Sequence, residues 1–213
     1  VEGNPLHSAQ MEIVRMVGKC LAVNTVIDED HQMSFVNFGE IEKGHLEAVS
    51  FVRPSAEIRL KTRFKTVVTS SAGYPLDKTY YQTVKGMVGP LDILEPGGNL
   101  VIVSACSEGM GSPDYAEAQV CLTNEGPDRF LQGIIQKKFA AVDEWQTEMQ
   151  VKAMKKVNIF LYTEGLTKDQ KALTGVRVIE SPLAAVMESV KQWDDRRVAV
   201  IPEGPYVIPL FEP

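Results

Sequence analysis

Three polar side chains recur at helical spacing in the segment that follows an apolar, β-branched run. Tyr81 and Lys85 are four residues apart, and Gln82 and Lys85 are three apart, so a helix would place all three on one face. A phenol, an amide and an ammonium group that converge on one point suit a small anionic ligand that carries hydroxyl groups. The simpler interpretation is a solvated helix face, which is where such residues usually lie.

The turn before this helix favours the ligand-binding interpretation. The run Val67–Ser70 ends in small and turn-forming residues, and Tyr74 lies within that turn. In open α/β sheets, ligands bind at the carboxyl ends of the strands, where such turns are found. Tyr74 is therefore a further candidate for contact with the ligand. The chain has no G-x-G-x-x-G motif, which weakens a classical dinucleotide-binding interpretation.

A second loop, Ser104–Pro113, also follows an apolar strand and precedes a helix. We expect it at the same sheet edge, where its glycines and serines permit close backbone approach and its amides could hold an anion. Ser107, Glu108 and Gly109 are the candidates, and a solvated loop carboxylate is an equally good interpretation of Glu108. Cys106 would be a nucleophile only if its thiol were acidified; a small core residue is the simpler interpretation.

Composition limits the functions that the chain can have. With 213 residues, 44% of them hydrophobic, it can bury a sizeable core. The net charge of −6 argues against a general nucleic-acid surface, which needs clustered Lys and Arg. We expect no membrane partner, because no apolar run reaches transmembrane length. We expect a cytoplasmic protein with reduced thiols, because the odd set of cysteines fits neither disulfide pairing nor a zinc pattern.

From Phe64 onward, strands and helices alternate at spacings typical of βαβ units. We predict an α/β domain of three layers with a mostly parallel, Rossmann-like sheet. Glu95–Gly98 is a strong turn signal. The expected strands are Lys65–Ser70, Asn99–Ala105, Asn158–Tyr162, Val176–Glu180 and Val198–Ile201, with a last short one at Tyr206–Leu210. The expected helices are Asp77–Met87, Leu91–Leu94, Pro113–Cys121, Arg129–Lys137, Asp143–Lys156, Leu166–Leu173 and Leu183–Trp193.

The first sixty residues do not continue this alternation. Ser8 would cap a helix over residues 9–19, and a hairpin of Leu21–Ile27 and Ser34–Phe38 would follow. A second helix, Ile41–Val52, would end before Pro54 because the residue before a proline is pushed out of helical space. We assign residues 1–62 to a remnant of a preceding, neighbouring domain and residues 63–213 to the C-terminal α/β domain.

Several phrases in the chain resemble the C-terminal half of the lactate racemase family, whose members use a nickel-pincer nucleotide cofactor. The long segment from Gly73 to Lys85, which contains two of the phrases, is the most specific part, and the resemblance covers essentially the whole chain. The phrases are Gly3-Asn4-Pro5-Leu6-His7, Gly73-Tyr74-Pro75-Leu76-Asp77, Tyr81-Gln82-x-x-Lys85-Gly86-Met87 and Cys106-Ser107-Glu108-Gly109-x-Gly111.

The resemblance implies inversion of a 2-hydroxy acid by hydride transfer to and from the cofactor. It implies that Lys85 and Tyr81 pair with the substrate carboxylate and that Gln82 bonds to oxygen atoms of substrate or cofactor. Ser107, Glu108 and Gly109 are the expected cofactor contacts. The acid and base histidines, the lysine that tethers the cofactor and the nickel-ligating histidine are implied to lie in a missing N-terminal domain. This chain would therefore supply no metal ligand, and by itself it would be an inactive part of an isomerase.

Two other functions remain open. A non-catalytic module could bind a small carboxylate or phosphate through the same turns. A cysteine-dependent hydrolase could use Cys106, although no histidine lies near it in the sequence to activate it.

Overall fold

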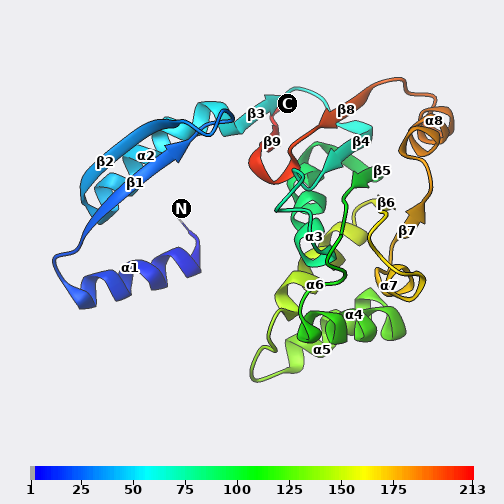
Figure 1. Ribbon diagram of the computed structural model, residues 1–213, viewed down its shortest axis with the longest axis horizontal. Helices are drawn as coiled ribbons and strands as arrows, with labels where there is room; N and C mark the ends of the chain where they lie inside the picture. Colours follow the sequence, from blue (N-terminus) through cyan, green and yellow to red (C-terminus); the bar gives the residue numbers. More distant parts are fainter. Residues whose placement is uncertain (1–2) are drawn as a thin grey trace. The chain divides into compact units, whose positions relative to one another are not determined.

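The computed structural model describes residues 3–213. The chain divides into two compact units, of which the second begins at Ile58. Figure 1 shows the elements of each unit. None of the helices among the described residues combines the length and the apolar character that crossing a bilayer requires.

The first unit is a β-hairpin backed by a helix, with a second helix before it. Its elements are α1 (Pro5–Val17), β1 (Leu21–Ile27), β2 (Met33–Glu40) and α2 (Ile41–Ala56). The predicted hairpin is present, and its antiparallel register pairs Leu21 with Glu40 and Val23 with Phe38. Helix α2 packs against both strands.

Two helix boundaries in this unit differ from the prediction. Helix α1 begins at Pro5, because the Asn4 side chain accepts hydrogen bonds from the amides of Leu6 and His7 and caps the helix before Ser8 is reached. Helix α2 continues through Pro54 to Ala56. The proline is tolerated because it lies in the last turn, where the amide of Glu57 still donates to the carbonyl of Arg53.

The second unit confirms the predicted α/β fold. The five strands of its main sheet are β4 (Phe64–Ser70), β5 (Leu94–Val103), β6 (Asn158–Tyr162), β7 (Arg177–Ile179) and β8 (Val198–Ile201). They form one parallel sheet in the order β7-β6-β5-β4-β8. The predicted turn Glu95–Gly98 is a bulge inside β5, because Phe64 pairs with Leu94 and Thr66 already pairs with Asn99. Strand β9 (Ile208–Phe211) pairs with β3 (Glu57–Leu60) outside this sheet.

Helices cover both faces of the sheet (Figure 1). On one face, Val67 packs in the same buried core as Val84 and Met87 of α3 (Tyr80–Val88). On the other, the Thr66 hydroxyl lies 2.6 Å from that of Ser189 in α8 (Pro182–Trp193). Adjacent residues of a strand point to opposite faces, so α3 and α8 lie on opposite sides. The remaining helical segments are η1 (Gly89–Ile93), α4 (Pro113–Glu125), α5 (Pro127–Gln136), α6 (Glu144–Met154), α7 (Lys168–Leu173) and η2 (Gly204–Tyr206).

Helix α3 begins at Tyr80, three residues later than predicted. The predicted first residue, Asp77, is committed to the neighbouring loop: its carbonyl accepts from the amide of Cys106 and its carboxylate from the amide of Ala105. The Thr79 hydroxyl then caps the helix by accepting from the amide of Gln82. The loop before α3 is therefore longer than the sequence indicates.

Candidate functional site

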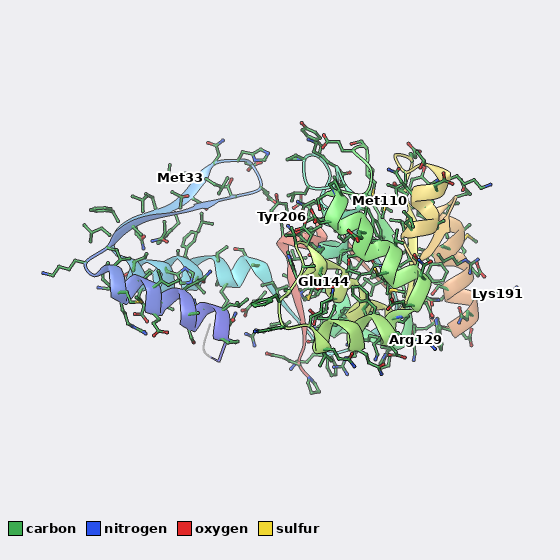
Figure 2. The ribbon with its side chains drawn as sticks, turned by 90° about the horizontal axis from the view of Figure 1, so that it is seen from below. Met33, Met110, Arg129, Glu144, Lys191 and Tyr206 are labelled. Carbon is green, nitrogen blue, oxygen red and sulfur yellow. The ribbon has the colours of Figure 1, made fainter. Side chains whose placement is uncertain are left out.

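The loops that follow β4 and β5 are joined by backbone hydrogen bonds at the carboxyl ends of these strands. The amide of Glu108 donates to the carbonyl of Lys78, and the amides of Tyr80 and Tyr81 donate to the carbonyls of Gly109 and Met110. Figure 2 labels Met110 in this region of the second unit. The first amides of α3 are therefore already satisfied by protein carbonyls, so the start of this helix is not an open anion site.

Side chains reinforce the same junction. The Lys78 ammonium forms an ion pair with the Glu108 carboxylate and lies 5.5 Å from the centre of the Tyr74 ring. The hydrogen bond to Glu108 raises the pKa of Lys78. Tyr74 itself is 80% exposed. Glu108, expected to bind cofactor, thus has a charge partner within this chain, while Tyr74 is open to a ligand.

Lys85 and Gln82 lie on α3 in different surroundings. Lys85 is exposed, and no acidic side chain among residues 3–213 lies at ion-pair distance from its ammonium group. Gln82 is half-buried, and its Oε1 atom is buried with no hydrogen-bond partner in the described part of the chain. A buried carbonyl oxygen without a donor is costly, so this atom is available to a ligand hydroxyl or to water.

Tyr81 lies one turn before Lys85 but packs toward other helices. Its ring meets Tyr115 of α4 edge-on at 5.2 Å and Trp145 of α6 at 6.1 Å between ring centres. Burial raises the pKa of Tyr81, and the negative charge of the Asp143 carboxylate raises it further. Sequence reasoning missed Asp143 as a site residue, because only the tertiary fold brings it to α3.

A close-packed corner lies where β4 and β8 end. A Cβ atom on Gly204 would lie 2.5 Å from the Ser70 carbonyl oxygen, and one on Gly86 would lie 2.7 Å from the same oxygen. Gly86 is one turn after Gln82 on α3, so this contact fixes how close the ligand-facing part of the helix lies to the sheet.

Cys106 occupies a structural position. Its side chain is fully buried, and its sulfur lies 3.3 Å from the Thr83 hydroxyl and 3.5 Å from that of Ser104. A nucleophilic thiol needs access to substrate and an activating cation or base. These contacts instead support the core interpretation. Gly109, beside it, has a positive φ of 80°, which a glycine adopts without strain.

The structure describes no metal centre. Among residues 3–213, no group of three or more His, Cys, Asp or Glu side chains could hold a metal ion. In the first unit, the rings of His7 and His45 stack with their centres 5.9 Å apart, a pairing that the sequence did not reveal.

A parallel α/β domain with open polar groups after its strands is typical of proteins that bind small molecules. Residues 60–209 match the family model described as the lactate racemase C-terminal domain. The chain therefore belongs to this family.

Two curated relatives are similar over nearly the whole chain. The lactate racemase of Thermoanaerobacterium thermosaccharolyticum is 27% identical over 98% of this chain and 49% of its own length. The lactate racemase of Lactiplantibacillus plantarum is 23% identical over 96% of this chain and 48% of its own length. The chain thus spans about half the length of the curated relatives it matches.

Solved structures support the fold. The lactate racemase apoprotein from T. thermosaccharolyticum superposes with a TM-score of 0.88 at 24% identity, covering 98% of this chain and 50% of that one. A protein from Thermotoga maritima superposes with a TM-score of 0.59 at 10% identity, covering 97% of this chain and 52% of that one.

Proposed function

We propose that this chain is the C-terminal part of a 2-hydroxyacid racemase or epimerase and that α3 supplies substrate-orienting side chains. Membership of the lactate racemase C-terminal domain family supports the isomerase class. The observation that carries the proposal is that two groups with no partner among residues 3–213 lie on one helix, the exposed ammonium of Lys85 and the buried Oε1 atom of Gln82. An ammonium group binds the carboxylate of a 2-hydroxy acid, and an amide oxygen accepts from its hydroxyl.

We further propose a nickel-pincer nucleotide as the cofactor, ligated by residues outside this chain. The donors on α3 are an ammonium, an amide and a phenol, which suit oxygen anions, whereas nickel takes ligands such as imidazole and thiolate. The chemistry that such a cofactor supplies when bound is the removal and return of a hydride at the substrate's α-carbon. The residues of this chain would bind and orient the substrate while that chemistry occurs.

The remaining candidate residues keep secondary roles in this proposal. Tyr74, exposed at the sheet edge, would form part of the substrate wall. Ser107, Glu108 and Gly109 stay predicted cofactor contacts, with the Glu108 carboxylate already paired to Lys78. The cytoplasmic location also stays a prediction.

A missing N-terminal domain would complete the protein. The chain matches only about half of its relatives, and the outer face of the hairpin in the first unit is apolar and exposed, with Val23, Val36 and Phe38 all more than half accessible. A further domain that covers this face would remove its apolar surface from water. The chain alone would then be inactive.

The test is a Lys85→Ala substitution in the full-length protein loaded with cofactor, assayed on a panel of 2-hydroxy acids. Losing a charge-assisted hydrogen bond worth about 1.5–3 kcal/mol should lower kcat/KM by roughly 10- to 150-fold. The matched control is Lys191→Ala, an exposed lysine of α8 (Figure 2), which should keep wild-type kcat/KM. Wild-type activity in Lys85→Ala would show that α3 does not orient the substrate.

The alternative function is a non-catalytic module that binds a carboxylate or phosphate, and the same Lys85 and Gln82 groups would support it. Isothermal titration calorimetry of this chain with lactate and with inorganic phosphate distinguishes the binding module from the racemase part. Tight binding of either without an N-terminal domain, abolished by Lys85→Ala, would favour the binding module. Weak or absent binding agrees with a substrate site that is completed by another domain.

A further inference from the structure

Tyr115 of α4 is the buried aromatic side chain against which Tyr81 packs. The two rings meet edge-on, with 5.2 Å between their centres and 85° between their planes. Tyr115 is fully buried, whereas Tyr81 is half-buried and so partly open to a ligand. Edge-to-face aromatic pairs at this separation are attractive and favour one relative orientation. The buried ring can therefore set the orientation of the partly accessible one.

The Tyr115 ring also packs against Tyr80, the first residue of α3. The centres of these two rings are 6.3 Å apart, and their planes are inclined by 44°. Tyr80 is fully buried, and its hydroxyl donates to the carbonyl of Thr174 at 2.9 Å. Tyr115 thus contacts the first two side chains of α3, of which one is fixed in the core and the other is half-buried.

A run of buried hydrogen bonds holds the Tyr115 hydroxyl. The Nε2 atom of Gln119 donates to this hydroxyl at 2.9 Å and to Gln150 Oε1 at 3.0 Å. Gln150 in turn donates to the Thr174 carbonyl at 2.6 Å, which is the acceptor that Tyr80 also uses. Gln119, Gln150 and Thr174 are fully buried. Because a buried polar group that loses its partner is costly, the ring of Tyr115 has one favoured position.

The backbone of Tyr81 is fixed as well. Its amide donates to the Met110 carbonyl, and its carbonyl accepts from the Gln146 side chain of α6 at 2.7 Å. Helix α6 packs against both α3 and α4 (Figure 1). A Cβ on Gly111 would lie 2.9 Å from Tyr81 Cβ and 3.6 Å from Tyr115 Cδ1. The torsion about the Cα–Cβ bond of Tyr81 remains, and the Tyr115 ring lies beside the ring that this torsion moves.

We propose that Tyr115 is a positioning residue that holds the Tyr81 side chain in one rotamer, with its hydroxyl already placed for the substrate. This inference rests on the proposed function in one respect, that α3 faces the substrate. The hydroxyl lies at the far end of the ring, so any other rotamer would carry it away from its place. A side chain that is ordered before binding loses no further rotamer entropy when the ligand binds. Trp145, which also lies beside Tyr81, is 52% exposed, so the buried Tyr115 is the more rigid support.

The first experiment measures the Tyr81 rotamer in this chain without ligand. Three-bond couplings from Tyr81 Cγ to its backbone nitrogen and carbonyl carbon are recorded by NMR on protein labelled with 13C and 15N. The wild type and Tyr115→Phe, which keeps the ring, should give the couplings of a single staggered rotamer, and Tyr115→Leu should give averaged couplings. The control Phe130→Leu, at a buried ring of another core cluster, should match the wild type. Averaged couplings in the wild type would overturn the proposal even if Tyr115→Leu does not fold, as would a single rotamer in folded Tyr115→Leu.

The second experiment uses the loaded full-length protein. Tyr115→Leu should lower kcat about tenfold to a hundredfold, because a misplaced orienting group costs that much, while KM changes less than about twofold because Lys85 still binds the carboxylate. Tyr81→Phe combined with Tyr115→Leu should have the kcat of Tyr81→Phe alone, because Tyr115 acts through the Tyr81 hydroxyl. Wild-type kcat in Tyr115→Leu, or losses that multiply in the double variant, would overturn the positioning role and leave the proposed function intact. Lys85→Ala, which tests the proposed function, is independent of these results.

Discussion

The two units of this chain differ in how completely they cover the apolar faces of their strands. In the hairpin of the first unit, the face toward α2 carries Asn24 and Asn37, which hydrogen-bond to each other at 2.9 Å, and Asn37 donates to the Gly44 carbonyl. The opposite face carries Val23 and Phe38, which are 64% and 70% exposed. In the second unit, Leu100, Val101 and Ile102 of β5 are fully buried between two layers of helices.

The difference shows which unit carries its own core. The second unit removes its apolar strands from water within the described chain, and its candidate site is built on a rigid sheet edge. The first unit leaves one apolar strand face uncovered, so its folding free energy draws less on hydrophobic burial than that of the second unit. The preceding domain proposed above would bury that apolar face and so add hydrophobic burial to the first unit.

The largest expected effect comes from truncating the core of the second unit. Leu161→Ala removes a fully buried side chain of β6 and should lower the free energy of unfolding by about 2–5 kcal/mol. Val23→Ala, on the exposed face of the first unit, should change it by less than about 0.5 kcal/mol. Urea denaturation of the purified chain measures both. Equal losses would mean that the hairpin face is buried in solution, for example by self-association.

A smaller effect is expected where backbone packs against backbone. Gly204→Ala would place a Cβ 2.5 Å from the Ser70 carbonyl oxygen and should cost about 1–3 kcal/mol of stability through forced displacement. The control from the first unit is Gly39→Ala, whose Cβ would meet no atom within 4 Å and which should be neutral or slightly stabilising. Melting temperatures compare the two. No loss in Gly204→Ala would show that the corner beside β4 is loosely packed.

The smallest expected effect is the loss of stability at low pH through protonation of Glu144. Burial alone would raise the pKa of Glu144, but the hydrogen bonds from Lys137 and the Ala141 amide outweigh it and the pKa is lowered. Stability from this group is therefore full above the usual glutamate pKa of about 4.3 and is lost as pH falls through the lowered value. Glu144→Gln should cost about 1 kcal/mol at neutral pH, since it exchanges a charged for a neutral hydrogen bond, and nothing at low pH.

The control for this pH dependence is Glu148→Gln, at an exposed acid of the same helix. This substitution should leave the free energy of unfolding unchanged at neutral and at low pH. Unfolding curves at neutral and acidic pH give the comparison. A Glu144→Gln cost that persists unchanged at the lowest pH would assign the effect to packing and not to charge. Among the described residues of the first unit no acidic side chain is buried, so this acid sensitivity should belong to the second unit.

Much of the fold could be predicted because its signals are local. β6 and β8 begin and end at the predicted residues, Asn158–Tyr162 and Val198–Ile201, since apolar runs between turns define buried strands. The boundaries that failed depend on hydrogen bonds from distant or alternative groups. Asp77 is withdrawn from α3 by amides of the next loop, and Asn4 caps α1 before Ser8 can.

The sequence by itself determined the α/β class, the family resemblance and the three polar residues on one helix. Periodicity and turn chemistry act over a few residues, so they can be read along the chain. Only the tertiary structure decided that Lys85 has no acidic partner among residues 3–213, that Glu108 is bound by Lys78 and that the Tyr81 ring packs against Tyr115 and Trp145. Hydrogen bonds and ion pairs require atoms within a few ångströms, and the packing of β4, α3, α4 and α6 alone sets which distant side chains come that close.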